Sequence, residues 1–143
     1  MKKENNKVGF YIAEIKTEQF AIFEENYSSK KETSLGTELQ FQLDQTSNLI
    51  GISLGIEFIQ LKKVFIKLQI NCHFKIEESA WKSFIKNTKI VFPKLFITHL
   101  AMITTGTSRG ILFAKTESTQ FSRFIIPTLN VAEMITTDIE FDL

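Results

Sequence analysis

The chain has 143 residues, a length that fits one domain with a substantial core. Its 17 Lys and Arg against 16 Asp and Glu give a net charge of +1, without the concentrated positive charge that nucleic-acid binding requires. No apolar run is long enough for a membrane helix or a secretory signal, and one Cys excludes an internal disulfide. We expect a cytoplasmic, single-domain protein over residues 1–143, with no nucleic-acid and no membrane partner.

Strict alternation of polar and apolar residues marks the first half of the chain. Such alternation is typical of half-buried strands, and short polar turns separate the segments. Residues 26–36 predict a loop. The pattern as a whole predicts an antiparallel meander with one face exposed to water. The predicted strands cover residues 8–15 with 19–24 (one long interrupted strand or two short ones), 39–44, 50–58 and 64–76.

The spacing of apolar residues changes after residue 76. Trp81, Phe84 and Ile85 are spaced as on a helix and follow acidic residues that favour a helix start. Residues 91–104 predict a longer helix that is apolar on most sides. Because one sheet covers only one side of a helix, this helix needs further cover. With 14 Phe in so short a chain, oligomerisation or an exposed apolar groove is expected.

The C-terminal part predicts short elements. Residues 104–110 predict a loop, and residues 111–115 with 121–126 predict a hairpin or an extended pair. Asn-Val-Ala-Glu at residues 130–133 has the pattern of a capping box. A last helix of about two turns should follow it.

Candidate chemical groups are few. Cys72 and His73 are neighbours in a predicted strand, so their side chains point to opposite faces and cannot share a metal ion. His99 interrupts the apolar helix, where a buried or interface histidine is expected. Its pairing with Cys72 as a catalytic dyad stays open as an alternative. Residues 106–110 lack the Lys and the spacing of a phosphate-binding loop. We expect no enzyme, no cofactor and no metal site.

Short blocks in a fixed order carry a family resemblance. This order resembles the SecB family of bacterial export chaperones, over residues 39–134. In that family a strand meander is followed by a Leu-Phe-Pro helix, an Arg-Gly loop and a Pro-Val-Asn-Phe segment. The blocks are Cys-His-Phe-Lys-Ile at residues 72–76, Trp-Lys-Ser-Phe-Ile at 81–85, Val-Phe-Pro at 91–93, Arg-Gly at 109–110 and Ile-Pro-Thr-Leu-Asn at 126–130.

The resemblance implies an α+β fold, with a four-stranded antiparallel meander followed by helices packed on one face. Members assemble as a dimer of dimers with the main helices between two sheets. The residues thereby implied at an oligomer interface are Phe92, Leu95, Phe96, His99, Leu100 and Ile103. Apolar channels in the family hold unfolded polypeptide and are lined by the sheet and the segment after the first helix. The client-binding residues implied here are Ile111, Leu112, Phe113, Phe121, Phe124 and Ile126.

Two functions fit this pattern. The first is a SecB-like, ATP-independent chaperone (a holdase) that binds extended apolar segments of unfolded proteins, with several weak contacts acting together. The alternative is a dedicated interaction module of the same fold that holds one partner, such as an antitoxin or a mobile-element protein, without an export role. Family members dock the export motor ATPase on acidic sheet faces. The near-neutral charge, with Lys67, His73 and Lys75 on the wet face, does not favour that docking.

Overall fold

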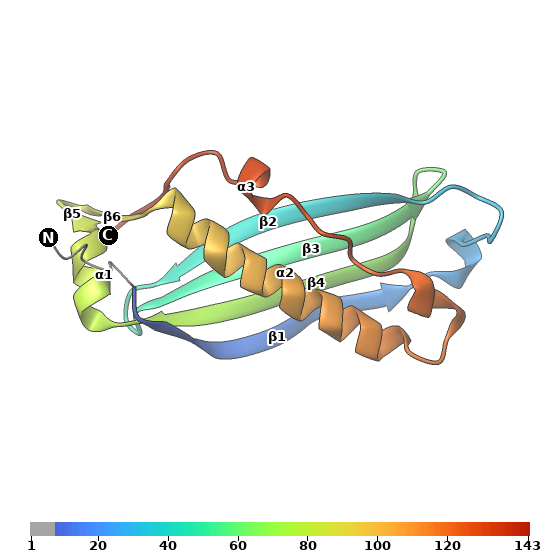
Figure 1. Cartoon of the computed structure of the whole chain (residues 1–143), viewed down its shortest axis with the longest axis horizontal. Coiled ribbons are helices and arrows are strands. Elements are labelled where there is room, and N and C mark those ends of the chain that lie inside the picture. The colour runs from blue at the N-terminus through green and yellow to red at the C-terminus, as the bar shows by residue number, and fades with distance from the viewer. Residues whose placement is uncertain (1–7) are drawn as a thin grey trace, which may run out of the picture.

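A four-stranded antiparallel sheet crossed by one long helix forms most of the molecule (Figure 1). The computed structural model describes residues 8–143, so the N-terminal residues used in the expectation about a secretory signal lie outside it. The strands of the large sheet are β1 (Phe10–Ile22), β2 (Ser34–Asp44), β3 (Leu49–Gln60) and β4 (Lys63–Ile76). They lie in the order β1-β4-β3-β2.

The predicted meander is confirmed, since β2, β3 and β4 are antiparallel neighbours. β1 pairs with β4 instead of β2, which leaves β1 and β2 at the two edges. β1 is one long strand with register shifts after Ile12 and after Thr17. Of the two alternatives that the sequence leaves open, one long interrupted strand or two short ones, the structure has the first. A short 3-10 helix, η1 (Glu24–Asn26), begins the connection to β2.

Helix α1 (Glu78–Phe84) follows the sheet as predicted, but Ile85 already belongs to the next strand. A second, small sheet consists of β5 (Ile85–Lys86), β6 (Lys89–Phe92) and the C-terminal β7 (Ile139–Asp142). The prediction of a helix starting at residue 91 is wrong. Phe92 lies in β6, because a residue before proline disfavours helical backbone. Its buried ring packs against Trp81, Phe84 and Phe141.

Helix α2 (Lys94–Thr116) is far longer than predicted. The predicted loop at residues 104–110 and the predicted strand at 111–115 are both wrong, because α2 passes through them. Its Thr and Ser hydroxyls donate to the carbonyl oxygens four residues earlier, which satisfies them inside the helix. No glycine in the described chain has positive φ. The hydroxyl donors within the expected loop are Thr104, Thr105, Thr107 and Ser108.

After α2 the chain turns back through a short 3-10 helix, η2 (Gln120–Arg123), and an irregular stretch to helix α3 (Val131–Met134). The predicted second strand of a hairpin at residues 121–126 is therefore also wrong. Asn130 does precede a helix, as the capping box predicts. Its side chain makes no capping hydrogen bond, and α3 has only four residues instead of about two turns.

The hydrophobic core lies between the sheet and α2. Each fully buried Ile, Leu or Phe side chain stabilises the folded state by about 1.5–3 kcal/mol compared with the same side chain left in water. The α+β class, with helices on one face of an antiparallel sheet, is thus confirmed. The side chains that form the centre of this core are Ile50, Ile52, Leu54 and Ile56 of β3, Ile66, Leu68, Ile70, Cys72 and Phe74 of β4, and Ile97, Leu100, Ala101 and Leu112 of α2.

Candidate functional site

The free edge of β2 is long and unprotected. The strand has 11 residues, contains no Lys, Arg or Pro, and pairs with β3 without a bulge. Edge strands usually carry a charged residue such as Lys, a Pro or a bulge. These features prevent the unpaired N–H and C=O groups of the edge from pairing with another extended chain. Among residues 8–143, no backbone hydrogen bond outside the β3 ladder involves β2. The opposite edge, β1, is broken by its two register shifts.

One face of β2 carries a row of apolar side chains that are only half-buried. They lie on the same face of the sheet as α2, since their cross-strand partners on β3 belong to the core. Leu35, for example, pairs with Phe58. The edge of β2 therefore combines free backbone groups with an apolar strip. The row consists of Leu35, Leu39, Phe41 and Leu43.

The outward side of α2 carries a second apolar feature, which we call the α2 stripe. Its residues recur every three or four positions and include no formal charge, with His neutral. Leu95, Met102 and Phe113 are 84%, 59% and 49% exposed. A Cβ at either glycine of the stripe would meet nothing within 4 Å. Nothing in the described chain therefore requires glycine there. The stripe consists of Leu95, His99, Met102, Gly106, Gly110 and Phe113.

A hollow of about 1010 Å³ lies beside the N-terminal end of the α2 stripe. It opens between the start of β1, helix α1 and helix α2. Phe10 projects into this region, and its ring meets the rings of Phe96 and His99 at centroid distances of 5.7 and 5.8 Å. Apolar surface thus continues from the stripe towards the edge strand β1.

Residues 117–130 form a segment that we call the strap. It starts at the end of α2 and runs back over the same face of the sheet (Figure 1). Phe121, Phe124 and Ile126 point inward and are buried, whereas Ile125 is exposed. Phe124 of the strap thereby packs on Phe58 of β3 and Phe65 of β4.

Arg109 fastens the strap to α2. Its Nε donates to the carbonyl oxygen of Ile126 at 2.6 Å, and its Nη2 donates to that of Pro127 at 2.9 Å. The sequence predicts a loop at residues 104–110, which includes Arg109, and the role of this arginine in holding a distant segment was missed. Arg109 lies inside α2, where the backbone carbonyls are already bonded within the helix. Its guanidinium therefore binds the carbonyls of residues 17 and 18 positions later in the chain.

Most of the predicted client-binding residues lie in the interior. Leu112, Phe121, Phe124 and Ile126 are buried within the chain itself. Ile111 is half-buried, and Phe113 is exposed on the α2 stripe. In this conformation a polypeptide reaches Phe113 directly but not the four buried side chains. The assignment of the six to client binding stays a prediction.

The predicted interface residues divide into two groups. Phe92 and Leu100 are fully buried within the chain, so they cannot contact a partner directly. Leu95, Phe96 and His99 lie together around the hollow at the end of α2. Ile103 is half-buried on the same helix. An interface at the exposed residues stays a prediction.

Cys72 is buried beneath α2, where its polar neighbours are the hydroxyls of Thr104 and Thr107. Burial raises the pKa of the thiol above its usual value of 9.0, and the two hydroxyls lower it by less. A raised pKa disfavours the thiolate, which is the nucleophilic form. His99 is exposed and its ring packs against Phe10.

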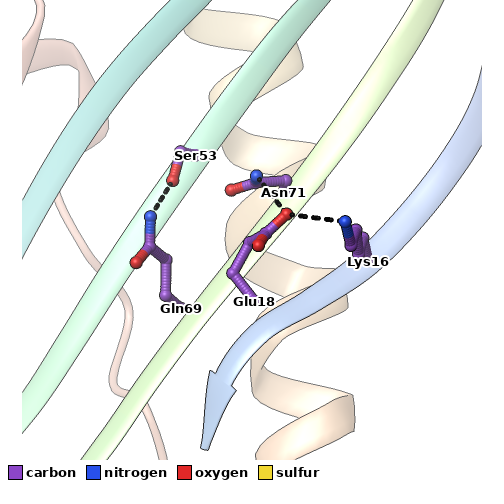
Figure 2. Close-up of polar contacts among 5 residues, drawn as sticks. All are labelled: Lys16, Glu18, Ser53, Gln69 and Asn71. Atoms are coloured by element: carbon purple, nitrogen blue, oxygen red, sulfur yellow. Dashed lines mark hydrogen bonds and ion pairs between the residues drawn. The ribbon is translucent and has the colours of Figure 1, made fainter.

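The face of the sheet opposite α2 is polar. Figure 2 shows its centre, where Gln69 donates to Ser53 at 2.9 Å and Asn71 donates to Glu18 at 3.1 Å. Glu18 also pairs with Lys16 at 3.4 Å. This face therefore combines amides with charges of both signs.

Two other kinds of site are not found within residues 8–143. No group of three or more His, Cys, Asp or Glu side chains there is placed to hold a metal ion. No helix in that range is long and apolar enough to cross a membrane.

Comparison with solved structures identifies the fold. The Mycobacterium tuberculosis SecB-like chaperone Rv1957, solved in complex with a ChAD peptide from the Rv1956 HigA1 antitoxin, matches with a TM-score of 0.52. The match covers 84% of this chain and 90% of that chain, at 10% sequence identity. The chain has a SecB-like fold. A protein of unknown function from Streptococcus agalactiae covers 86% and 98% at 15% identity, with a TM-score of only 0.39. No protein-family model and no curated protein sequence matches the chain.

Within this SecB-like fold, the apolar row of β2, the strap and α2 all lie on one side of the sheet. Sequence reasoning missed two of these features. The lack of Lys, Arg and Pro in residues 34–44 was a readable signal for an unprotected edge. The path of the strap could not be predicted from a local sequence pattern, because it depends on the residue at which α2 ends.

Proposed function

We propose that this SecB-like chain is a chaperone that binds extended apolar segments of unfolded proteins without ATP. The observation that carries the proposal is the free edge of β2 with its half-buried apolar row. An extended segment can pair its backbone with this edge and place every second side chain against the row. Backbone pairing is independent of sequence, so one edge serves many clients.

The comparison supports polypeptide binding in general terms. The Mycobacterium tuberculosis protein of the same fold was solved with a bound peptide from an antitoxin. That complex also favours a second candidate function for this chain, a module dedicated to one partner such as an antitoxin or a mobile-element protein. The two functions differ in breadth, and binding to an array of unrelated peptides separates them. Many bound peptides with alternating apolar residues indicate a general chaperone, and a single strong binder indicates a dedicated module.

We further propose that the chain assembles as a homo-oligomer, as a dimer of dimers, through the α2 stripe and the adjoining hollow. Large exposed apolar patches usually mark interaction surfaces. Gly106 and Gly110 leave the helix backbone open, so that a second helix can approach closely. Leu95 and Met102, both more than half exposed, would then be covered by the partner copy.

No catalytic activity and no cofactor form part of this proposal. The buried thiol of Cys72 with its raised pKa speaks against a nucleophile. A cytoplasmic location also stays a prediction. Docking to the export motor ATPase is not proposed, because the outer sheet face carries Lys16 and amides beside its carboxylates.

The first test measures aggregation of a chemically unfolded protein by light scattering after dilution from denaturant. The wild-type chain at stoichiometric amount should suppress the aggregation. Leu39→Lys places a charge in the apolar row of β2 and should weaken the suppression about tenfold, a loss of roughly 1.4 kcal/mol. Gln19→Lys adds the same charge on the polar face of β1, away from the β2 edge, and is the matched control. If the wild-type chain leaves aggregation unchanged even in excess, the chaperone proposal is wrong.

A further inference from the structure

The strap has the form of a bound extended peptide. After η2, its residues 124–130 belong to no helix and to no strand ladder. Side chains alternate along it, with Phe124 and Ile126 buried and Ile125 and Pro127 exposed. This is the alternation that an extended apolar client would show on the same surface.

Side chains, and not a backbone ladder, hold the strap in place. The ring of Phe124 meets the rings of Tyr27, Phe58 and Phe65 at 5.7, 5.6 and 5.0 Å. The guanidinium of Arg123 lies 6.0 Å from the ring centroid of Tyr27, outside the strap. In the described chain, no backbone hydrogen bond joins residues 125–130 to any strand of the large sheet. The strap can therefore leave without breaking a ladder.

Arg109 binds the strap through groups that every polypeptide has. It donates to two consecutive backbone carbonyls, those of Ile126 and Pro127, and to no strap side chain. These two hydrogen bonds fasten the strap whatever its side chains are, so removal of the guanidinium should loosen the strap.

The surface beneath the strap continues into the proposed client site. Phe58, which contacts Phe124, is the cross-strand partner of Leu35 in the apolar row of β2. Removing the strap would join this aromatic surface to the row. The result would be one apolar strip from Tyr27 and Phe65 to the free edge.

We propose that the strap occupies part of the polypeptide-binding surface and that a client displaces it. The inference rests on the proposed chaperone function and adds to it a built-in competitor. In the absence of a client, the strap keeps Phe58 and Phe65 away from water and from other copies of the chain. Phe124 and Ile126 then belong to the competitor and not to the client site.

The test compares Arg109→Ala with wild type and with Lys115→Ala, a control that removes the same charge near the end of α2. Binding of a fluorescein-labelled, reduced and carboxymethylated protein is followed by fluorescence anisotropy. A looser strap is a weaker competitor, so Arg109→Ala should bind about tenfold more tightly. Lys115→Ala should bind as wild type does. Hydrogen exchange of the Phe121, Ser122 and Phe124 amides, which donate hydrogen bonds within the strap, should be faster in Arg109→Ala, and faster in wild type when the client is bound.

Phe124→Ala gives an independent reading that leaves α2 intact. If Phe124 belongs to the client site, this change weakens client binding, which would overturn the inference. If it belongs to the strap, the change tightens binding. Unchanged protection of the Phe121, Ser122 and Phe124 amides in the client complex would likewise overturn the inference and leave the chaperone function standing. Failure of the chaperone proposal gives a different result from failure of the strap inference. In that case neither wild type nor any variant would bind the labelled protein.

Discussion

Replacing Gly106 and Gly110 by alanine separates the stability of α2 from its proposed role in assembly. Both glycines lie in the interior of the helix and have no positive φ. An added Cβ meets nothing within 4 Å at either position, so no steric cost arises within the chain. Alanine is favoured over glycine in a helix interior by about 1 kcal/mol per position. The double variant should therefore raise the free energy of unfolding of the isolated chain by about 2 kcal/mol.

Assembly should respond in the opposite direction. If a second helix packs on the α2 stripe, two methyl groups at the point of closest approach push its backbone away. A tenfold rise in the dissociation constant corresponds to roughly 1.4 kcal/mol, and at least this rise is expected. Gly106→Leu, with a much larger side chain on the same open surface, should abolish the assembly.

Two measurements on the same samples test this reasoning. Urea unfolding of the monomer fraction gives the stability, and sedimentation equilibrium gives the dissociation constant. A double variant that is stabilised and still assembles as wild type does would refute the role of the stripe in assembly. A double variant that is destabilised as a monomer would refute the continuous helix through residues 104–110.

Three further outcomes follow from buried groups. Leu112→Ala should lower the free energy of unfolding in urea by about 2–5 kcal/mol, because the side chain is fully buried against the sheet; a loss under 1 kcal/mol would contradict its place in the core. Gln60→Met should cost roughly 1–3 kcal/mol and speed hydrogen exchange around Ser28, since the buried Gln60 amide bonds both the N–H and the carbonyl of Ser28. The folded pKa of Cys72 is raised, so its contribution to stability is complete below about pH 9, the usual thiol value, and is lost as pH rises towards the folded pKa. Between pH 8 and 10, wild type should therefore lose more stability than Cys72→Ala, and parallel curves would contradict the burial of the thiol.

The large sheet was readable from the sequence because its signal is local. Ile50, Ile52 and Leu54 alternate with Gly51 and Ser53, and the side chains fall on opposite faces as expected. Which strand β1 pairs with was not readable. That choice depends on contacts between segments more than 40 residues apart, and no alternation pattern contains it.

The long helix was misread for a chemical reason. Thr104, Thr105 and Ser108 are typical of loops, since their hydroxyls compete for backbone groups. In the structure all three are buried and donate to carbonyls within α2. Packing against the sheet overrides their weak helix propensity.

That error carried over to the candidate site. A helix that ends at residue 104 leaves residues 111–115 and 121–126 for a hairpin or an extended pair, and the resemblance assigns their apolar side chains to client binding. The helix continues to Thr116, so Leu112 faces the core and Phe113 faces outward. The α2 stripe became visible only once Gly106 and Gly110 were placed on the helix.

The strap is anchored at both ends, and this gives it a quantitative advantage over any free peptide. It continues covalently from α2, and beyond α3 the chain is fixed where β7 pairs with β6 and the amide of Leu143 donates to the carbonyl of Thr88. A segment tethered in this way competes at an effective concentration in the millimolar range. A single short apolar stretch at micromolar concentration would seldom displace it. A long unfolded chain offers many such stretches and, in the proposed assembly, would contact several copies of this chain at once, so its effective concentration would be comparable with that of the strap. Tethering would thus make the protein sensitive to the length of an exposed polypeptide as well as to its apolar character.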